Sequence, residues 1–234
     1  MAVEDFSQPV LAGEGASDYE RYLRTDELLS LQKRPEERVH RDELLFQTVH
    51  QSSELWIKLA CSEVAEATVR VRAGEASSAA RLLRRAAISL GYILDQLRML
   101  EQLSPWEYQT IRQVLGHGSG FDSPGMREIR RVSPPLWDAF VELLTAAGLD
   151  PVEVYREGSE DQIALAEGLV DWDEGVTVWR IRHYKRVARI IGDSVVGTQG
   201  TPVEVLGRLV HKQMYPDLWE ARNRLTALAK EEEG

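Results

Sequence analysis

The sequence lacks the features that would place it among membrane, disulfide-rich or zinc-cluster proteins. No apolar run approaches the roughly 20 residues that a membrane-spanning helix needs. Cys61 is the single cysteine, so no intrachain disulfide can form and no thiolate zinc cluster can be built. The N-terminus, MAVEDFSQPVLAGEGASDYE, is acidic and does not show the basic-then-apolar order of a secretory signal. We therefore expect a cytoplasmic protein with no membrane partner.

Basic charge is scarce relative to acidic charge. The 234 residues include 38 Asp and Glu against 28 Lys and Arg, a formal net charge of −10. Such a balance argues against binding to nucleic acid or to an anionic membrane surface. Two segments are rich in glycine, GHGSGFDSPG (116–125) and GDSVVGTQGTP (192–202). Neither follows a strand pattern, so neither predicts a phosphate-binding loop. A hydrophobic fraction of 43% is ordinary for a folded domain and argues against disorder.

Alternating strand patterns are nearly absent, and apolar residues recur with helical periodicity almost everywhere. Only VTV at 176–178 hints at a strand, and it lies in a helical context. The sequence predicts a flexible N-terminal arm over residues 1–16 and one all-α domain, a helical bundle, over residues 17–234. Helices are expected over 18–31, 39–73, 77–103, 105–115, 134–147, 159–191, 202–213 and 216–231.

Two histidines, His50 and His183, lie beside apolar helix stripes. His50 follows Phe46 by one turn, and His183 shares a stripe with Trp179, while the basic residues around His183 mostly lie on other faces. A lone histidine on such a stripe is more often a core residue with a hydrogen-bond partner than a metal ligand. The spacing lacks the neighbouring carboxylates of a zinc or di-iron helix site. A single strong histidine ligand opposite a second polar group is the arrangement of haem proteins, so both interpretations stay open.

A polar pair and a loop are further candidates for ligand binding. Tyr108 and Arg112 are one turn apart, so both side chains project from the same helix face. A guanidinium and a phenol together can bind a carboxylate; the alternative, which sequence alone favours, is an ordinary salt bridge. The segment GTQGTP (197–202) could offer backbone N–H groups and the Thr198 hydroxyl to a ligand, or it could be a plain turn.

Several blocks in a fixed order resemble the tryptophan 2,3-dioxygenase family of haem enzymes. They are DYERYLRTDELLSLQ (18–32), LLFQTVHQSSELWIKL (44–59), SPWEYQTIRQVLGHGSGFDS (104–123), WRIRHYKRVARIIG (179–192) followed by GTQG, and MYPDLWEARNRL (214–225). The ordered set covers most of the chain except roughly 130–175, where typical members carry more helical sequence. The resemblance implies haem b as cofactor, an indole amino acid and O₂ as substrates, and a homotetramer built as a pair of dimers.

The resemblance also implies a role for individual residues in the pocket. His183 is expected as the proximal ligand of the haem iron. His50 is expected as the distal histidine that hydrogen-bonds the indole N–H, with Phe46 packed against the indole. Arg112 and Tyr108 are expected to bind the substrate carboxylate.

Four more residues are expected to complete the pocket. Thr198 is similar to the family residue that contacts this end near a haem propionate. In the family an N-terminal helix reaches into a neighbouring subunit's pocket, so Tyr19, Tyr22 and Leu23 are expected to close the site in trans.

The chain departs from the family at two places. The family's loop usually reads GTGGSSG, whereas GTQGTP stands here, so Gln199 and Pro202 could reshape the amino-acid end of the pocket. The shorter middle of the chain could also open the site.

The implied reaction is dioxygenation of L-tryptophan or a ring-substituted tryptophan. Insertion of O₂ into the indole C2–C3 bond of tryptophan gives N-formylkynurenine. The alternatives are a haem-dependent monooxygenase of an indole compound and a non-catalytic haem-binding helical protein.

Overall fold

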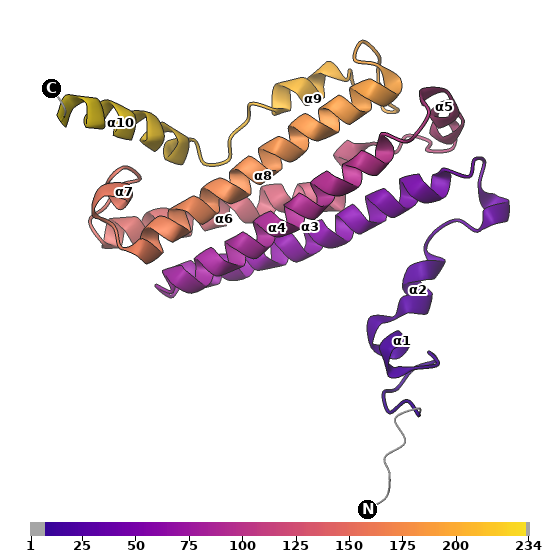
Figure 1. The fold of residues 1–234 in the computed structure, drawn as a ribbon, viewed down its shortest axis with the longest axis horizontal. Coiled ribbons are helices and arrows are strands. Elements are labelled where there is room, and N and C mark those ends of the chain that lie inside the picture. The colour runs from indigo at the N-terminus through magenta and orange to yellow at the C-terminus, as the bar shows by residue number, and fades with distance from the viewer. Residues whose placement is uncertain (1–7, 233–234) are drawn as a thin grey trace, which may run out of the picture.

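The structure is a computed structural model that describes residues 8–232, and its regular elements are helices (Figure 1). The only β pairing in this described part is an isolated bridge between Val196 and Pro202, which confirms the all-α prediction. The helices are α1 (Asp18–Leu23), α2 (Thr25–Ser30), η1 (Pro35–Glu37), α3 (Glu43–Arg72), α4 (Ala76–Leu100), α5 (Pro105–Gln113), η2 (Gly120–Asp122), α6 (Pro124–Ala146), α7 (Glu153–Glu157), α8 (Glu160–Ile191), α9 (Glu204–Leu209) and α10 (Pro216–Glu232).

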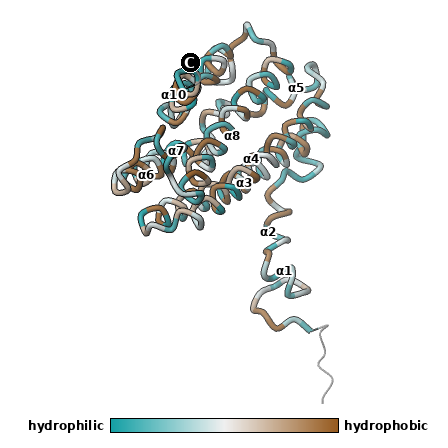
Figure 2. The backbone as a smooth tube through the Cα atoms, turned by 60° about the vertical axis from the view of Figure 1, so that its left-hand side comes forward, coloured by the Kyte–Doolittle hydropathy of each residue, from teal (hydrophilic) through white to brown (hydrophobic). Residues whose placement is uncertain are grey.

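Four long helices, α3, α4, α6 and α8, run side by side and form the body of the bundle (Figure 1). α3 packs against α4 and α6, and α4 packs against α8. α5 and α9 lie at one end of the bundle, whereas α1 and α2 stand away from it in both ribbon views (Figures 1 and 2). Hydrophobic and hydrophilic residues alternate along each long helix (Figure 2), as amphipathic helices around one core require.

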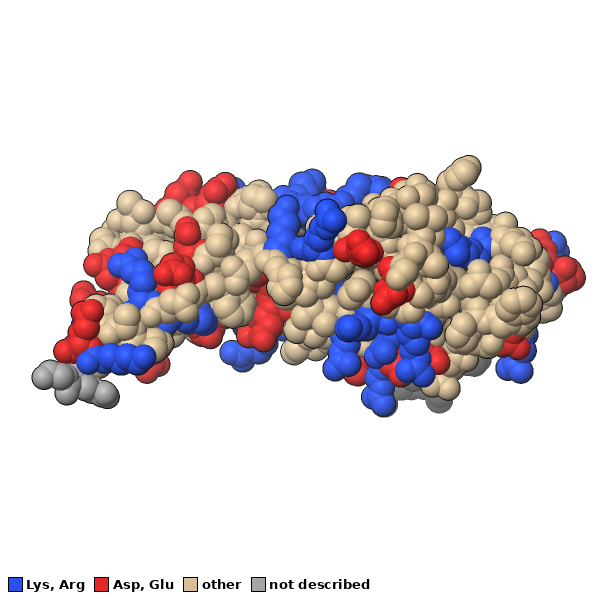
Figure 3. Space-filling view, turned by 90° about the horizontal axis from the view of Figure 1, so that it is seen from above, with Lys and Arg blue, Asp and Glu red and all other residues tan. Residues whose placement is uncertain are grey.

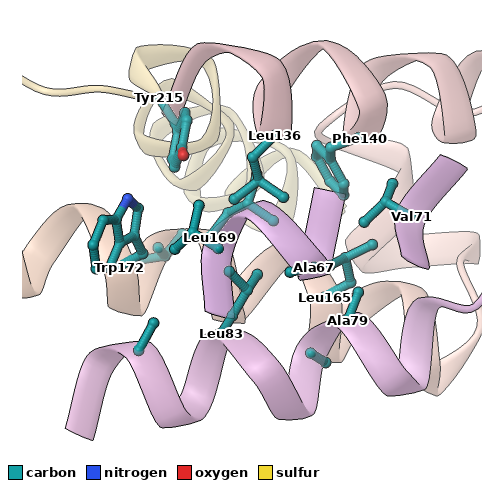
Figure 4. Packing of buried hydrophobic residues seen from close by; sticks show 14 of the residues in the cluster. Ala67, Val71, Ala79, Leu83, Leu136, Phe140, Leu165, Leu169, Trp172 and Tyr215 are labelled. Carbon is teal, nitrogen blue, oxygen red and sulfur yellow. The ribbon is translucent and has the colours of Figure 1, made fainter. Parts of the chain in front are cut away.

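The core is built where these four helices face one another. Leu83 of α4, Leu136 of α6 and Leu169 of α8 are fully buried and point into the same space (Figure 4). Gly168 lets α8 approach α4 closely, because a Cβ at this position would lie 3.2 Å from the Leu83 side chain. No described helix is long and apolar enough to cross a membrane.

Two helix predictions were wrong. The helix expected over 134–147 begins at Pro124, because Ser123 caps it, accepting a hydrogen bond from the Met126 N–H, and Pro124 suits its first turn. Pro134 and Pro135 therefore lie inside α6, where burial of the helix face offsets the backbone hydrogen bonds that they remove.

The helix expected over 18–31 is two helices, α1 and α2. They are separated at Arg24, whose φ of 53° puts it in the left-handed region. Neither Gly nor Pro marks this break in the sequence, so the helical pattern gave no signal for it. The other helices agree with the predictions to within a few residues, apart from the short α7, which was not predicted, and α9, which covers half of 202–213.

Asp173 of α8 fastens the C-terminal helix to the bundle. One oxygen of its fully buried carboxylate accepts hydrogen bonds from the Met214 N–H (2.9 Å), the Tyr215 N–H (3.1 Å) and the Trp219 indole N–H (2.9 Å). A charged acceptor can satisfy three donors at once, which no apolar residue at this position could do.

Replacement of this carboxylate should loosen α10. Asp173→Ala leaves one buried and two partly buried N–H groups without an acceptor, so we expect a loss of about 3 kcal/mol in the free energy of unfolding, measured by urea denaturation. Asp173→Asn keeps an acceptor oxygen and should lose less, and Glu174→Ala, at an exposed neighbour, should change little. Equal stability of the Ala and Asn variants would contradict this role.

Candidate active site

One cavity of about 460 Å³ lies at the end of the bundle where α5 and α9 meet the long helices. Its lining comes from α3, Leu100 at the end of α4, α5 and Leu115 after it, the 116–123 segment, the start of α6, the second half of α8, and residues 197–209. Six of the nine predicted site residues line it: Phe46, His50, Tyr108, Arg112, His183 and Thr198. Residues that lie up to 152 positions apart in the sequence therefore line the same cavity.

His50 lies on the part of the cavity wall formed by α3, and its hydrogen bond determines which ring nitrogen carries the hydrogen. Its ring packs against Phe46 with centroids 4.1 Å apart, and its Nδ1 lies 2.7 Å from the Phe46 carbonyl oxygen. A carbonyl only accepts, so Nδ1 carries the hydrogen and Nε2 is left as an acceptor in the neutral ring. The ring is reachable by solvent from the open cavity yet densely surrounded by protein, and this burial lowers the pKa of His50. His50 is thus prepared to accept a hydrogen bond from a ligand.

The α8 wall presents His183 in an apolar setting. Its ring stacks on Trp179, with centroids 4.8 Å apart and planes 11° from parallel. Burial, with a smaller contribution from the charge of His50, lowers the pKa of His183 to about 4. The imidazole is therefore neutral near pH 7, the form in which it can bind a metal.

Gly120 of η2 lies against the ring of His183. A Cβ at Gly120 would be 3.6 Å from Cε1 and 3.7 Å from Nε2. The 116–123 segment therefore faces the ring edge that carries Nε2.

α5 places a phenol and a guanidinium on the cavity wall. Ser104 caps this helix by accepting a hydrogen bond from the Glu107 N–H, and Pro105 occupies the first turn, as the sequence predicted. Burial raises the pKa of Tyr108, which keeps its hydroxyl protonated and able to donate. Arg112 donates from Nη2 to the Val196 carbonyl oxygen at 2.6 Å, so its partner is a backbone group rather than the carboxylate of an ordinary salt bridge.

The GTQGTP segment forms a hairpin whose tip lines the cavity. The Gly197 N–H donates to the Thr201 carbonyl (2.9 Å), and the Gly200 N–H donates to the Gly197 carbonyl (3.0 Å). Gly200 has a φ of +73°, which other residues rarely adopt. This turn carries Thr198, whose hydroxyl donates to the Gly118 carbonyl.

Three predicted residues lie outside the cavity of this chain. Tyr19, Tyr22 and Leu23 belong to α1, which stands apart from the bundle, and their exposed fractions are 68%, 78% and 46%. Large apolar side chains this exposed are suited to contact another surface.

Three arginines and one glutamate line the cavity without having been predicted: Glu54, Arg130, Arg180 and Arg186. Arg180 and Arg186 are three residues before and after His183, and the prediction that the nearby basic residues mostly lie on other faces did not foresee that these two side chains line the cavity. Glu54 is one turn after His50, so the helical spacing of α3 could have identified it. Arg130 lies on α6, in a stretch where no helix was predicted.

Glu54 joins α3 to the start of α6. Its carboxylate accepts hydrogen bonds from the Ser123 hydroxyl (2.5 Å) and from the Gly125 N–H (2.9 Å). Gly125 is buried so tightly that a Cβ there would lie 2.7 Å from Glu54 Oε2 and 2.7 Å from Ile57 Cγ2. This contact fixes where the 116–123 segment enters α6.

We expect Gly125→Ala to destabilise the fold by about 1–3 kcal/mol, because the added methyl group forces the α3–α6 contact apart. Gly91→Ala is the matched control: Gly91 is also helical, but a Cβ there meets nothing within 4 Å. The control should be stabilised by about 0.5–1 kcal/mol, since alanine favours the helix. Urea denaturation of both variants checks the opposite signs, and the same sign in both would contradict the role of Gly125.

Comparison with known proteins shows the family to which the chain belongs. Residues 4–132 match the family described as tryptophan 2,3-dioxygenase, which is more than half of the chain. The chain belongs to the tryptophan 2,3-dioxygenase family. Its relatives named tryptophan 2,3-dioxygenase include proteins of Anaeromyxobacter sp. (strain K), 33% identical over 92% of this chain and 98% of the relative, and of Myxococcus xanthus, 31% identical over 91% of each. A third, from Bacillus thuringiensis (strain Al Hakam), is 30% identical over 88% of this chain and 92% of the relative.

Membership of the tryptophan 2,3-dioxygenase family makes the protein an oxidoreductase. The aligned stretch with the Myxococcus protein spans 265 residues, more than the 234 of this chain, so gaps fall within the chain. The family match ends at residue 132, close to the start of the 130–175 stretch where the resemblance was expected to be interrupted, whereas the alignment with the Myxococcus protein covers 91% of the chain.

Proposed function

We propose that this protein is a haem-dependent dioxygenase that converts L-tryptophan, or a ring-substituted tryptophan, and O₂ into N-formylkynurenine or its substituted form. The observation that carries the proposal is the shared cavity: neutral imidazoles come from α3 and α8, and Tyr108 and Arg112 from α5. The two histidines are close enough for the charge of one to lower the pKa of the other.

The residues of the cavity fit a haem. His183 offers a neutral imidazole in a wall formed with Trp179 and Val187, which suits a metal held in an apolar porphyrin pocket. Arg130 and Arg180 also line the cavity and offer positive charge for the two carboxylates of the cofactor. When bound, ferrous haem would supply the O₂ chemistry that cleaves the indole C2–C3 bond, with both oxygen atoms retained in the product.

The other side chains would bind and orient the amino acid. Nε2 of His50, left as an acceptor, would take a hydrogen bond from the indole N–H, and Phe46 would pack against the indole ring. Arg112 and the protonated Tyr108 would hold the carboxylate through charge-assisted hydrogen bonds. Thr198 would contact the same end of the substrate. These contacts fix the ring in one orientation, which is the contribution of the protein to the reaction.

The product mass tests this proposal. We expect the reduced holoenzyme, mixed with tryptophan and O₂, to give a product heavier than tryptophan by two oxygen atoms. A gain of one oxygen atom would instead support the indole monooxygenase, and haem binding without tryptophan consumption would support a non-catalytic haem protein.

Variants of the two histidines separate cofactor binding from substrate binding. His183→Ala should lose or weaken the haem absorption band, because the proposed iron ligand is gone. His50→Ala should keep the band and lower turnover, since only a substrate contact is removed. An unchanged spectrum in His183→Ala would contradict the proposed ligand.

We also propose a homotetramer in the cytoplasm, in which α1 of one subunit closes the cavity of another. The exposed Tyr19, Tyr22 and Leu23 on a helix that stands away from its own bundle support this arrangement. We propose no nucleic-acid partner: acidic residues outnumber basic ones, and small groups of either sign alternate on the face seen in Figure 3.

A mixed oligomer tests closure in trans. Subunits lacking residues 1–24 keep their own cavity, whereas full-length Arg112→Ala subunits keep α1 but bind tryptophan weakly. If α1 acts in trans, the co-assembled hybrid should recover tryptophan affinity that neither parent oligomer has. Hybrid affinity no better than the two parents would mean that α1 serves its own subunit or no cavity at all.

A further inference from the structure

The hairpin of residues 193–203 covers the amino-acid end of the cavity and is held there by few contacts. Its central turn places Thr198 and Gln199 at the tip, between Gly197 and Gly200. Residues 193–196, which lead into the turn, are exposed. Packing anchors only the end that joins α9, where Val203 is buried, so hydrogen bonds to neighbouring segments must fix the rest of the hairpin.

Three side-chain hydrogen bonds join this hairpin to α5 and to the 116–123 segment. Arg112 donates to the Val196 carbonyl at 2.6 Å, Thr198 donates to the Gly118 carbonyl, and Gln199 Nε2 donates to Asp122 Oδ2 at 2.6 Å. The three bonds lie at the base and at the tip of the hairpin. Together they hold the 193–203 hairpin closed over the cavity, and we call this hairpin the roof.

Two of these three bonds use side chains that the substrate would recruit. A carboxylate is a stronger acceptor for Arg112 than the neutral Val196 carbonyl, so substrate binding competes with this contact. Thr198 is likewise proposed to contact the amino-acid end of the substrate. Only the bond of Gln199 remains free of this competition.

Asp122 is prepared for this bond before any ligand binds. The Ser119 N–H donates to the same oxygen, Oδ2, at 3.1 Å, as part of the capping arrangement of η2. The carboxylate is therefore held in one orientation by its own segment, and the amide of Gln199 meets a fixed, charged acceptor.

We propose that the Gln199–Asp122 hydrogen bond holds the hairpin closed over the amino-acid end of the cavity, so that Gln199 is a positioning residue that favours indole substrates with an α-amino acid group over plain indoles. The substrate part rests on the proposed function. The hairpin would contact only the end of the substrate that carries the carboxylate and the amino group. A plain indole lacks these groups, so its affinity does not depend on where the hairpin lies. Because the hairpin is already held closed, tryptophan binding has less conformational entropy to overcome than it would with a mobile hairpin.

Gln199→Met tests this directly, because methionine keeps the length of the side chain and removes its donor. In the holoenzyme we expect the Kd for L-tryptophan to rise roughly three- to tenfold, the factor that one ordinary hydrogen bond represents, while the Kd for indole stays unchanged. Amide hydrogen exchange in residues 193–203 should become faster in the substrate-free variant. Gln102→Met makes the same chemical change at an exposed site outside the cavity and should alter none of these values.

A reversed pair distinguishes the hydrogen bond from a general effect of substitution. Gln199→Glu alone sets two carboxylates against each other and should open the roof further at pH 7. Combined with Asp122→Asn, it restores one donor and one acceptor, so slow exchange and tryptophan affinity should return.

Equal losses for tryptophan and indole, unchanged hairpin exchange in Gln199→Met, or no rescue by the reversed pair would overturn the proposal. If the wild-type protein binds no tryptophan, the proposed function fails. Hydrogen exchange of the hairpin then still decides whether Gln199 holds it, because that measurement needs no substrate.

Discussion

The site depends on two imidazoles that burial keeps uncharged. A protonated His183 could not ligate a metal, and a protonated His50 could not accept a hydrogen bond at either nitrogen. The cavity wall lowers the pKa of both, and a positive charge on His50 further disfavours one on His183. The apolar lining therefore has a chemical consequence beyond the exclusion of water, because it selects the protonation states that the proposed reaction needs.

The body of the bundle and the roof of the cavity are held in different ways. α3, α4, α6 and α8 meet in a core of fully buried side chains, and this rigid body carries both histidines. The 193–203 hairpin is joined to its neighbours mainly by side-chain hydrogen bonds. Segments with few buried contacts open at low free energy. The roof can thus move to admit a ligand while the distance between the two imidazole walls is kept by the packed helices.

The fold class and the positions on a single helix were readable from the sequence. Helical periodicity predicted that Phe46 and His50, and likewise Tyr108 and Arg112, project together, because residues one turn apart share a face. Periodicity says nothing about which helices face one another. That α3, α5 and α8 surround one cavity was therefore an expectation from the family resemblance alone.

Contacts between distant loops were beyond the reach of sequence patterns. Gln199 and Asp122 are 77 positions apart and both belong to segments without periodicity. Nor could spacing show that α6 continues through Pro134 and Pro135, since its stability there comes from packing against other helices. Arg180 and Arg186 were missed for a related reason: long side chains can reach a cavity from beside the apolar stripe.

The stretch over 130–175, where the family resemblance was expected to be interrupted, contributes to the bundle rather than to the cavity wall. Within the described residues, no position between Arg130 and Val176 lines the cavity. That stretch instead supplies core residues such as Phe140, Leu169 and Trp172. The cavity walls are formed by segments on either side of this stretch. A difference in substrate between this protein and its relatives is better sought at the 193–203 hairpin, where GTQGTP meets the amino-acid end of the cavity.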